Sequence, residues 1–159
     1  MTKSQNKMRL EIPAQSINEG FARSTVAAFA AQLDPTLEEI GDIKTAVSEA
    51  VTNCVVHAYS KTAGQSGTIV IDAELFADRI TIRISDNGRG IKDIERAMQP
   101  FETTATEKDE RSGMGFTVMQ SFMDSLNVIS NPKGGTTVQM KKFFQRKKPN
   151  AINEAQKTI

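Results

Sequence analysis

The sequence predicts an α/β (α+β) domain built as a two-layer sandwich, in which helices cover one face of a mixed, mainly antiparallel sheet. Helical periodicity comes first along the chain, strand alternation follows, and a late helix lies between strands. Two β-branched runs, TIVIDAELF and RITIRIS, are joined by Ala77 and Asp78, which is typical of a hairpin. The 159 residues, 38% apolar and 25% charged, suffice for one hydrophobic core.

One strand and one helix are expected before the first strong break in the chain. Residues 8–13 (MRLEIP) alternate as a strand does, and the polar residues 1–7 before them are expected to be disordered. Ser16 is a suitable N-cap for the helix, which Pro35 ends. The expected apolar stripe of this helix consists of Ile17, Phe21, Thr25, Ala28, Phe29 and Leu33.

A second, longer helix is expected over residues 36–59, and the loop KTAGQSG at 61–67 separates it from the hairpin. After the hairpin we expect a short helix near 93–98 and a polar stretch at 99–112 with little periodicity. The expected apolar face of the second helix consists of Ile40, Ile43, Val47, Ala50, Val51, Cys54 and Ala58.

The last part of the domain should be a helix followed by two strands. The strands are expected near 127–130 and 135–144, on either side of an Asn-Pro-Lys-Gly turn. The domain would then span residues 8–144, and the polar residues 145–159 would form a disordered tail. The expected apolar stripe of the helix consists of Phe116, Met119, Phe122, Met123 and Leu126.

Bulk composition narrows the possible functions. A net charge of +1 gives no electrostatic reason to expect nucleic acid as a partner. No apolar run approaches the ~18 residues of a membrane span, and the start MTKSQNK has no signal-peptide character. A single cysteine, Cys54, excludes an internal disulfide and suits a reducing compartment. We therefore expect a cytoplasmic protein.

Three polar residues on the second helix form the first candidate site. Glu49, Asn53 and His57 follow one another at i, i+4 and i+8, so they share one stripe beside the apolar face. An amide oxygen suits Mg2+, which takes oxygen ligands. Glu49, one turn away, could accept a proton from a nucleophile. The alternative is a solvated flank of the helix, with His57 as a helix-end hydrogen-bonding residue.

Asp86, at the start of DNGRGI, is the second candidate. The preceding in-phase residues of its strand are all isoleucines, so a carboxylate lies where the alternation calls for a core residue. Such an acceptor could take a hydrogen bond from an exocyclic amine such as that of adenine. Gly88 and Gly90 would let the backbone turn tightly under a ligand. The alternative is an aspartate that merely initiates a turn.

The stretch ERSGMGF at 110–116 is the third candidate. It lacks the Walker A pattern, and Val118 stands where a dinucleotide fingerprint has its third glycine. Gly113 and Gly115 would nevertheless expose backbone amides at a helix N-terminus, which favours an anion such as phosphate. Arg111 could add a charge-assisted contact. The alternative is a pair of capping glycines.

These motifs, in this order, resemble the boxes of the GHKL ATPase/kinase superfamily. The pattern includes Glu49-x-x-x-Asn53, the Asp86 turn, the GMG stretch and Gly135-Thr136, and the similarity covers roughly residues 9–144. SEAVTN, DNGRGI, ERSGMGF and the SFMD that follows are similar to the anti-sigma-factor serine kinases within that superfamily.

The resemblance implies a role for each matching residue. Asn53 would coordinate Mg2+, Glu49 would be the general base, and residues 99–112 would form a lid over ATP or ADP. Arg111 would act on the γ-phosphate and, with Glu110 and Arg23, contact partner proteins. The residues implied to bind the nucleotide are Asn53, Asp86, Gly88, Gly90, Thr104, Gly113, Met114, Gly115 and Thr136.

The resemblance also implies two activities. A homodimer would keep a sigma factor from RNA polymerase, and the same protein would phosphorylate an anti-anti-sigma partner on serine with Mg-ATP. The sporulation members of the family fit ERSGMGF and SFMD better than the general-stress members do. A non-catalytic binding module is a further alternative, although it would be expected to lose Glu49 or Asn53.

Overall fold

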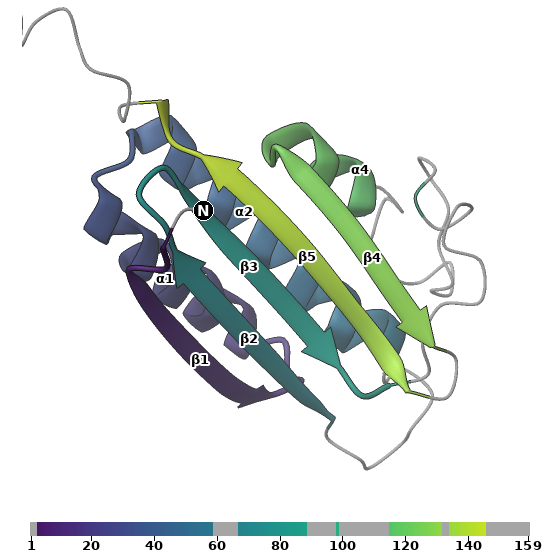
Figure 1. Cartoon of the computed structure of the whole chain (residues 1–159). Coiled ribbons are helices and arrows are strands. Elements are labelled where there is room, and N and C mark those ends of the chain that lie inside the picture. Colours follow the sequence, from purple (N-terminus) through teal and green to yellow (C-terminus); the bar gives the residue numbers. More distant parts are fainter. Residues whose placement is uncertain (1–2, 59–66, 89–97, 99–114, 132–133, 146–159) are drawn as a thin grey trace, which may run out of the picture.

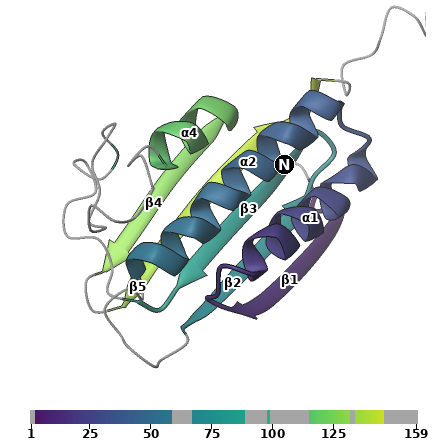
Figure 2. The same cartoon turned by 180° about the vertical axis from the view of Figure 1, so that it is seen from behind.

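The structure is a computed structural model, which describes residues 3–58, 67–88, 98, 115–131 and 134–145. Within these residues the chain forms two layers, a five-stranded sheet and a layer of helices. Figures 1 and 2, which show opposite sides of the molecule, place α1, α2 and α4 on the same face of the sheet. The predicted two-layer architecture is therefore confirmed.

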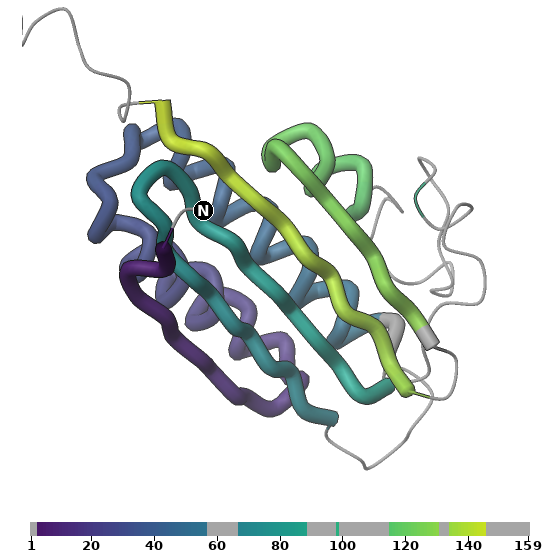
Figure 3. Tube along the Cα trace, in the orientation of Figure 1, coloured from purple at the N-terminus to yellow at the C-terminus, as the bar shows by residue number. Residues whose placement is uncertain are grey.

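The sheet has the strand order β1-β2-β3-β5-β4 (Figure 3). Its strands are β1 (Asn6–Pro13), β2 (Thr68–Leu75), β3 (Arg79–Asp86), β4 (Ser125–Asn131) and β5 (Gly135–Phe143). All four pairings are antiparallel, so the expectation of a mixed sheet is wrong for the described residues. The physical reason is the position of β5. The chain returns through β4 at the edge, and β5 then pairs between β4 and β3, so β4 never lies beside β3.

The first strand is longer than predicted. It begins at Asn6 because β2 extends to Leu75 and offers backbone partners there: Asn6 pairs with Leu75, and Lys7 with Glu74. An ion pair at 3.5 Å joins the ammonium of Lys7 to the carboxylate of Glu74. Residues 6 and 7 therefore belong to the sheet and not to the terminal segment.

Helix α1 (Asn18–Ala30) begins differently from the prediction, and its buried face matches the predicted stripe only at Phe29, with Leu33 buried in the turn that follows. Its N-cap is Ile17, which makes no side-chain capping bond, so Ser16 is not the cap. Ile17 and Phe21 are 82% and 53% exposed. Apart from Phe29, the buried face consists of small and branched residues, which allow α1 to lie close to α2 and the sheet. The buried residues of α1 and the following 3-10 turn are Ala22, Val26, Ala27, Phe29, Ala30 and Leu33.

Helix α2 (Leu37–Asn53) begins where the sequence predicts. Thr36 is its N-cap and forms a capping box with Glu39: the Thr36 hydroxyl accepts from the Glu39 amide, and the Glu39 carboxylate accepts from the Thr36 amide. Regular α-helix ends at Asn53, and a π-helical turn, Cys54–Ala58, continues it.

Helix α4 (Gly115–Phe122) lies next to α2, and both pack on the helix-facing side of the sheet. Phe116, Met119 and Met123 are buried as predicted, whereas Phe122 is 38% exposed. The isoleucines of β2 and β3 belong to one buried cluster with residues of α1, α2 and α4. The core isoleucines with no more than 1% exposure are Ile43, Ile69, Ile71, Ile80, Ile82 and Ile84.

Candidate functional site

The candidate site lies at one end of the two layers, where four elements meet. The C-terminal end of α2 supplies Asn53, β3 ends with Asp86, α4 begins at Gly115, and β5 begins with Gly135 and Thr136. These residues are up to 83 positions apart in the sequence (136 − 53). The antiparallel pairing of β3 with β5 and the packing of α4 on α2 bring them together.

The carboxylate of Asp86 is held in place by backbone donors. One oxygen, Oδ1, accepts from the amide of Gly88 at 2.9 Å and from the amide of Thr136 at 3.3 Å. Burial raises the pKa of Asp86, and these amides, with Cys54, oppose part of that rise. A half-buried carboxylate fixed in this way presents its second oxygen, Oδ2, with a defined orientation. That oxygen could accept a hydrogen bond from an amino group of a ligand.

Cys54 contacts the second oxygen of Asp86, a contact that the sequence did not predict. Its Sγ lies 3.6 Å from Oδ2, and burial raises the pKa of the thiol well above its ordinary value. The thiol is therefore protonated and is a weak donor to the carboxylate. Cys54 and Asp86 both lie on faces that point to the helix–sheet boundary. Combining the two periodicities could have suggested the contact.

Gly135 allows β5 to approach the end of β3. Its φ is +87°, and an added Cβ would collide with the carbonyl oxygen of Asp86 and lie 2.8 Å from Cα of Asn87. Glycine is the residue that adopts this conformation without strain. Because Gly135 fits there, the amide of Thr136 reaches the Asp86 carboxylate. The Thr136 side chain is 8% exposed, and its hydroxyl lies 3.0 Å from the hydroxyl of Ser130.

Gly115 places the start of α4 against the side chain of Asn53. A Cβ at this position would lie 2.9 Å from Nδ2 and 3.0 Å from Oδ1 of Asn53, so only a glycine leaves the amide where it is. The amide is half-buried, and its oxygen is a hard ligand. A single amide oxygen fits Mg2+, which usually keeps several waters and is bound by one or two protein groups plus phosphate oxygens.

Two further predicted residues, Glu49 and Arg23, lie on α2 and on the neighbouring helix α1. Glu49, half-buried, is one turn before Asn53 on α2. Arg23 of α1 forms an ion pair at 3.6 Å with Glu19 and donates to the hydroxyl of Ser48 at 3.4 Å. Arg23 is therefore joined to the stretch of α2 that carries Glu49. Its side chain remains 42% exposed and can also meet a partner.

The structure thus places five of the predicted site residues at one end of the two layers: Asn53, Asp86, Gly88, Gly115 and Thr136. His57 lies in the π-helical turn after Asn53. The remaining predicted site residues lie outside the described residues, as do the short helix near 93–98, apart from Met98, and the polar stretch at 99–112. These site residues are Gly90, Thr104, Glu110, Arg111, Gly113 and Met114.

Comparison with known families defines the class of protein. Residues 12–142 match the family described as the Histidine kinase-like ATPase domain, which spans most of the chain and every residue placed at the site above. Solved structures show the same fold. One covers the RsbU and RsbW domains of a Mycobacterium tuberculosis protein, with a TM-score of 0.61 at 18% identity, over 87% of this chain and 32% of that one. Another is the histidine kinase domain of a blue-light activated kinase from Erythrobacter litoralis, with a TM-score of 0.52 at 20% identity, over 88% of this chain and 69% of that one.

Curated relatives identify the branch. Anti-sigma F factor from Caldanaerobacter subterraneus is 58% identical over 89% of this chain and 96% of its own length. The proteins of that name from a Thermoanaerobacter species and from Clostridium perfringens are 58% and 56% identical, over 87% and 86% of this chain and 94% and 96% of theirs. The chain belongs to the anti-sigma F factor family. Among the described residues, no helix is long and apolar enough to cross a membrane.

Proposed function

We propose that this protein is an anti-sigma factor that binds a sporulation sigma factor, sigma-F, and blocks formation of the RNA polymerase holoenzyme. We further propose that it is a protein serine kinase that uses Mg-ATP to phosphorylate an anti-anti-sigma partner. The observation that carries the proposal is the pairing of Asn53 with Gly115 beside the fixed Asp86 carboxylate. An amide that would hold the metal, the start of a helix and an acceptor that would read the base thus lie at the same end of the two layers.

The described residues support a division of the site into two parts. At one part, Asp86 Oδ2 would accept from the exocyclic amine of adenine, while Gly88 and Thr136 hold Oδ1. At the other part, the N-terminal end of α4 would attract phosphate through its dipole, next to Asn53. The bound Mg2+ would supply charge neutralisation between the phosphates. Gly113, Met114 and Arg111 are proposed to complete this part, with Gly90 and Thr104 contributing elsewhere in the pocket.

Glu49 is the proposed general base. It lies one turn from Asn53 on α2, so a serine hydroxyl presented to the phosphate would be near its carboxylate. Catalysis would otherwise rest on positioning and charge stabilisation, as in other phosphoryl transfers. Arg23 on α1, with Glu110 and Arg111, is proposed to contact the protein partners. The working form is proposed to be a cytoplasmic homodimer.

A second candidate function is the anti-sigma serine kinase of the general stress response. The relatives named above support the sporulation branch, because each carries the name anti-sigma F factor. A non-catalytic nucleotide-dependent binding module is a third candidate. The presence of both Glu49 and Asn53 on α2 supports a catalytic protein over that module.

The test is a phosphorylation assay with labelled ATP, Mg2+ and candidate anti-anti-sigma proteins. We expect label on a serine of the partner with the unaltered protein, and a loss of about 10²–10⁴ in rate with Glu49→Ala, the usual contribution of a general base. Nucleotide binding by Glu49→Ala should remain within a few-fold of the original. Undiminished labelling would refute the assignment of the base.

A matched control distinguishes the loss of the Glu49 carboxylate from a general disturbance of α2. Ser48→Ala changes the neighbouring residue of α2, whose hydroxyl accepts from Arg23, and should keep phosphorylation within a few-fold. Partner binding is tested separately, by measuring capture of purified sigma-F with and without Mg-ATP. Retained capture by Glu49→Ala would show that sigma-factor binding and phosphate transfer are separable.

A further inference from the structure

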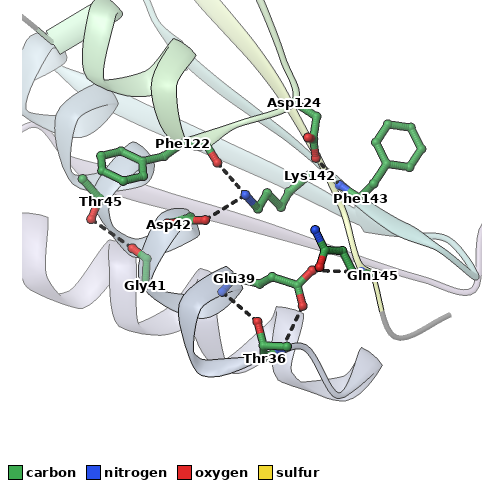
Figure 4. A network of polar contacts seen from close by, with 10 residues as sticks. All are labelled: Thr36, Glu39, Gly41, Asp42, Thr45, Phe122, Asp124, Lys142, Phe143 and Gln145. Atoms are coloured by element: carbon green, nitrogen blue, oxygen red, sulfur yellow. Dashed lines mark hydrogen bonds and ion pairs between the residues drawn. The ribbon is translucent and has the colours of Figure 1, made fainter. Parts of the chain in front are cut away.

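Lys142 places a positive charge on the helix-facing side of the sheet, at the opposite end from Asp86. In β5 it follows Val138 and Met140 in phase, and it pairs laterally with Ile80, which is fully buried. A buried ammonium is unfavourable unless it has partners. Lys142 has two: its Nζ lies 2.9 Å from Oδ2 of Asp42 on α2 and 2.7 Å from the carbonyl oxygen of Phe122 (Figure 4).

Both groups of this ion pair are well shielded from water. The side chains of Lys142 and Asp42 are 13% and 18% exposed, far less than those of the Lys7–Glu74 pair on the open face. Partial burial strengthens the attraction and reduces screening by salt. The ammonium also lies at the C-terminal end of α4, where the helix dipole favours a cation. The contact therefore joins α2, α4 and β5 at one point.

The exit of α4 is attached to β5 by backbone bonds as well. The amide of Asp124 donates to the carbonyl of Lys141 at 2.9 Å, and the carboxylate of Asp124 accepts from the amide of Phe143 at 2.7 Å. Figure 4 shows Phe122 and Asp124 on either side of the Lys142 side chain. These bonds attach α4 to the strand. The Lys142–Asp42 pair extends the attachment to α2, on which α4 also packs directly.

Helix α4 is consequently held against α2 at both of its ends. Its first residue, Gly115, contacts Asn53 at the C-terminal end of α2, and its last, Phe122, is linked through Lys142 to Asp42 near the N-terminal end. The two helices are therefore antiparallel. With eight residues, α4 has only about two turns, so its two ends are close enough for a shift at one end to reach the other, although Phe116 and Met119 also anchor it in the core.

We propose that Lys142 and Asp42 are positioning residues for phosphate binding: their ion pair fixes the far end of α4 and thereby holds its N-terminal end beside Asn53. The inference rests on the proposed function, which places the phosphates at that N-terminal end. Neither residue touches the nucleotide. They act through α4, whereas the base-reading part is formed by Asp86 at the end of β3 and Thr136 at the start of β5, at the opposite end of that strand from Lys142.

The test compares Lys142→Met with the matched control Lys141→Met. Both variants replace a lysine by a methionine in the same strand, but Lys141 is exposed and belongs to the opposite face of the sheet. Binding of Mg-ATP and of adenosine is measured by calorimetry. We expect Lys142→Met to weaken the binding of Mg-ATP about tenfold. It should also lower kcat, since misplacement of reacting groups by about 1 Å can reduce the rate about 10²-fold. Adenosine affinity should stay within twofold.

Two further variants make each outcome decisive. Lys142→Arg keeps a cationic donor and should restore most of the Mg-ATP affinity. Asp42→Asn keeps the shape of the side chain and an acceptor oxygen but removes the charge. It should also lower the affinity for Mg-ATP, which provides a test even if Lys142→Met does not fold. The proposal would be overturned if Lys142→Met lost affinity equally for Mg-ATP and adenosine. It would also be overturned if Lys141→Met lost as much Mg-ATP affinity as Lys142→Met. If the unaltered protein binds no Mg-ATP, the proposed function itself fails, and the two failures are thus distinguishable.

Discussion

Asp86 combines two properties that oppose each other in an unliganded protein. Its carboxylate is partly buried, which disfavours the charge, yet two backbone amides and a thiol are arranged around it. The position was predictable because the isoleucine alternation of β3 leads directly to it. Its contact with Cys54 was not predicted, although the two periodicities together direct both residues to the helix–sheet boundary. The sequence assigns Cys54 to an apolar face, and only the packing of α2 on β3 brings its sulfur to Asp86.

The first prediction concerns stability and pH at Asp86. Because burial raises its folded pKa, proton binding favours the native state at low pH, and that contribution is lost as pH rises through the folded pKa. Above the folded pKa, the native state therefore carries a partly buried charge. Asp86→Asn removes this charge and keeps an oxygen for the amides of Gly88 and Thr136. We expect the variant to gain stability relative to the original as pH rises from about 4 to about 7.

The measurement is urea denaturation of both proteins at the two pH values, without nucleotide. A stability difference that does not change with pH would contradict burial as the cause of the raised pKa. Mg-ATP binding provides the functional comparison. With Oδ1 still held by amides, the asparagine would turn an NH₂ group toward the adenine amine, so affinity should fall by about 1.5–3 kcal/mol, the range for a hydrogen bond to a charged group.

At the scale of elements, helix α1 shows where periodicity alone misleads. The stripe of Phe21 and Thr25 and the stripe of Ala22 and Val26 are both spaced i, i+4, and the first contains the larger aromatic residue. Packing favours the second, because alanine permits close approach of α1 to α2. Helix α2 was predictable for the opposite reason. Its start is specified by local chemistry, the capping box after Pro35, which depends little on tertiary context.

The second prediction tests that capping box. Thr36→Ala removes the acceptor for the Glu39 amide and should reduce the free energy of unfolding by about 1 kcal/mol, the usual effect of losing such a cap. Thr45→Ala is the matched control. The Thr45 hydroxyl donates to the Gly41 carbonyl on an exposed part of the same helix, and alanine has the higher helix propensity, so stability should change by no more than about 0.5 kcal/mol.

The free energy of unfolding of the two variants is measured by urea denaturation. Equal losses for Thr36→Ala and Thr45→Ala would mean that the capping box contributes nothing beyond an ordinary surface threonine. Nucleotide affinity should be unchanged in both, since Thr36 lies at the end of α2 remote from Asn53. A fall in affinity with Thr36→Ala alone would indicate that the two ends of α2 are coupled.

At the scale of the whole molecule, the sequence predicts the layers but not the connection between them. Each strand of the β4–β5 hairpin could pair with β3 without changing its own alternation. The choice of β5 depends on α4, which packs on α2 and leads the chain to the edge of the sheet. That choice makes the sheet antiparallel and brings Gly135 and Thr136 to Asp86. The site is therefore a product of topology, although its residues were recognisable one by one.

The third prediction concerns the stabilisation of the native state by a bound nucleotide. Asn53, Asp86, Gly115 and Thr136 meet only in the folded chain, so a nucleotide that they bind stabilises the native state and not the unfolded one. Mg-ATP at about 100 times its Kd should raise the free energy of unfolding by about 2.7 kcal/mol, measured by urea denaturation. Mg-GTP should give little increase, because guanine presents a carbonyl oxygen where adenine presents the amine that Asp86 accepts from. An equal increase with both nucleotides would contradict the role of Asp86 as the base-reading residue. It would not contradict the proposed phosphate part of the site. No increase with either would contradict nucleotide binding at this end of the sheet.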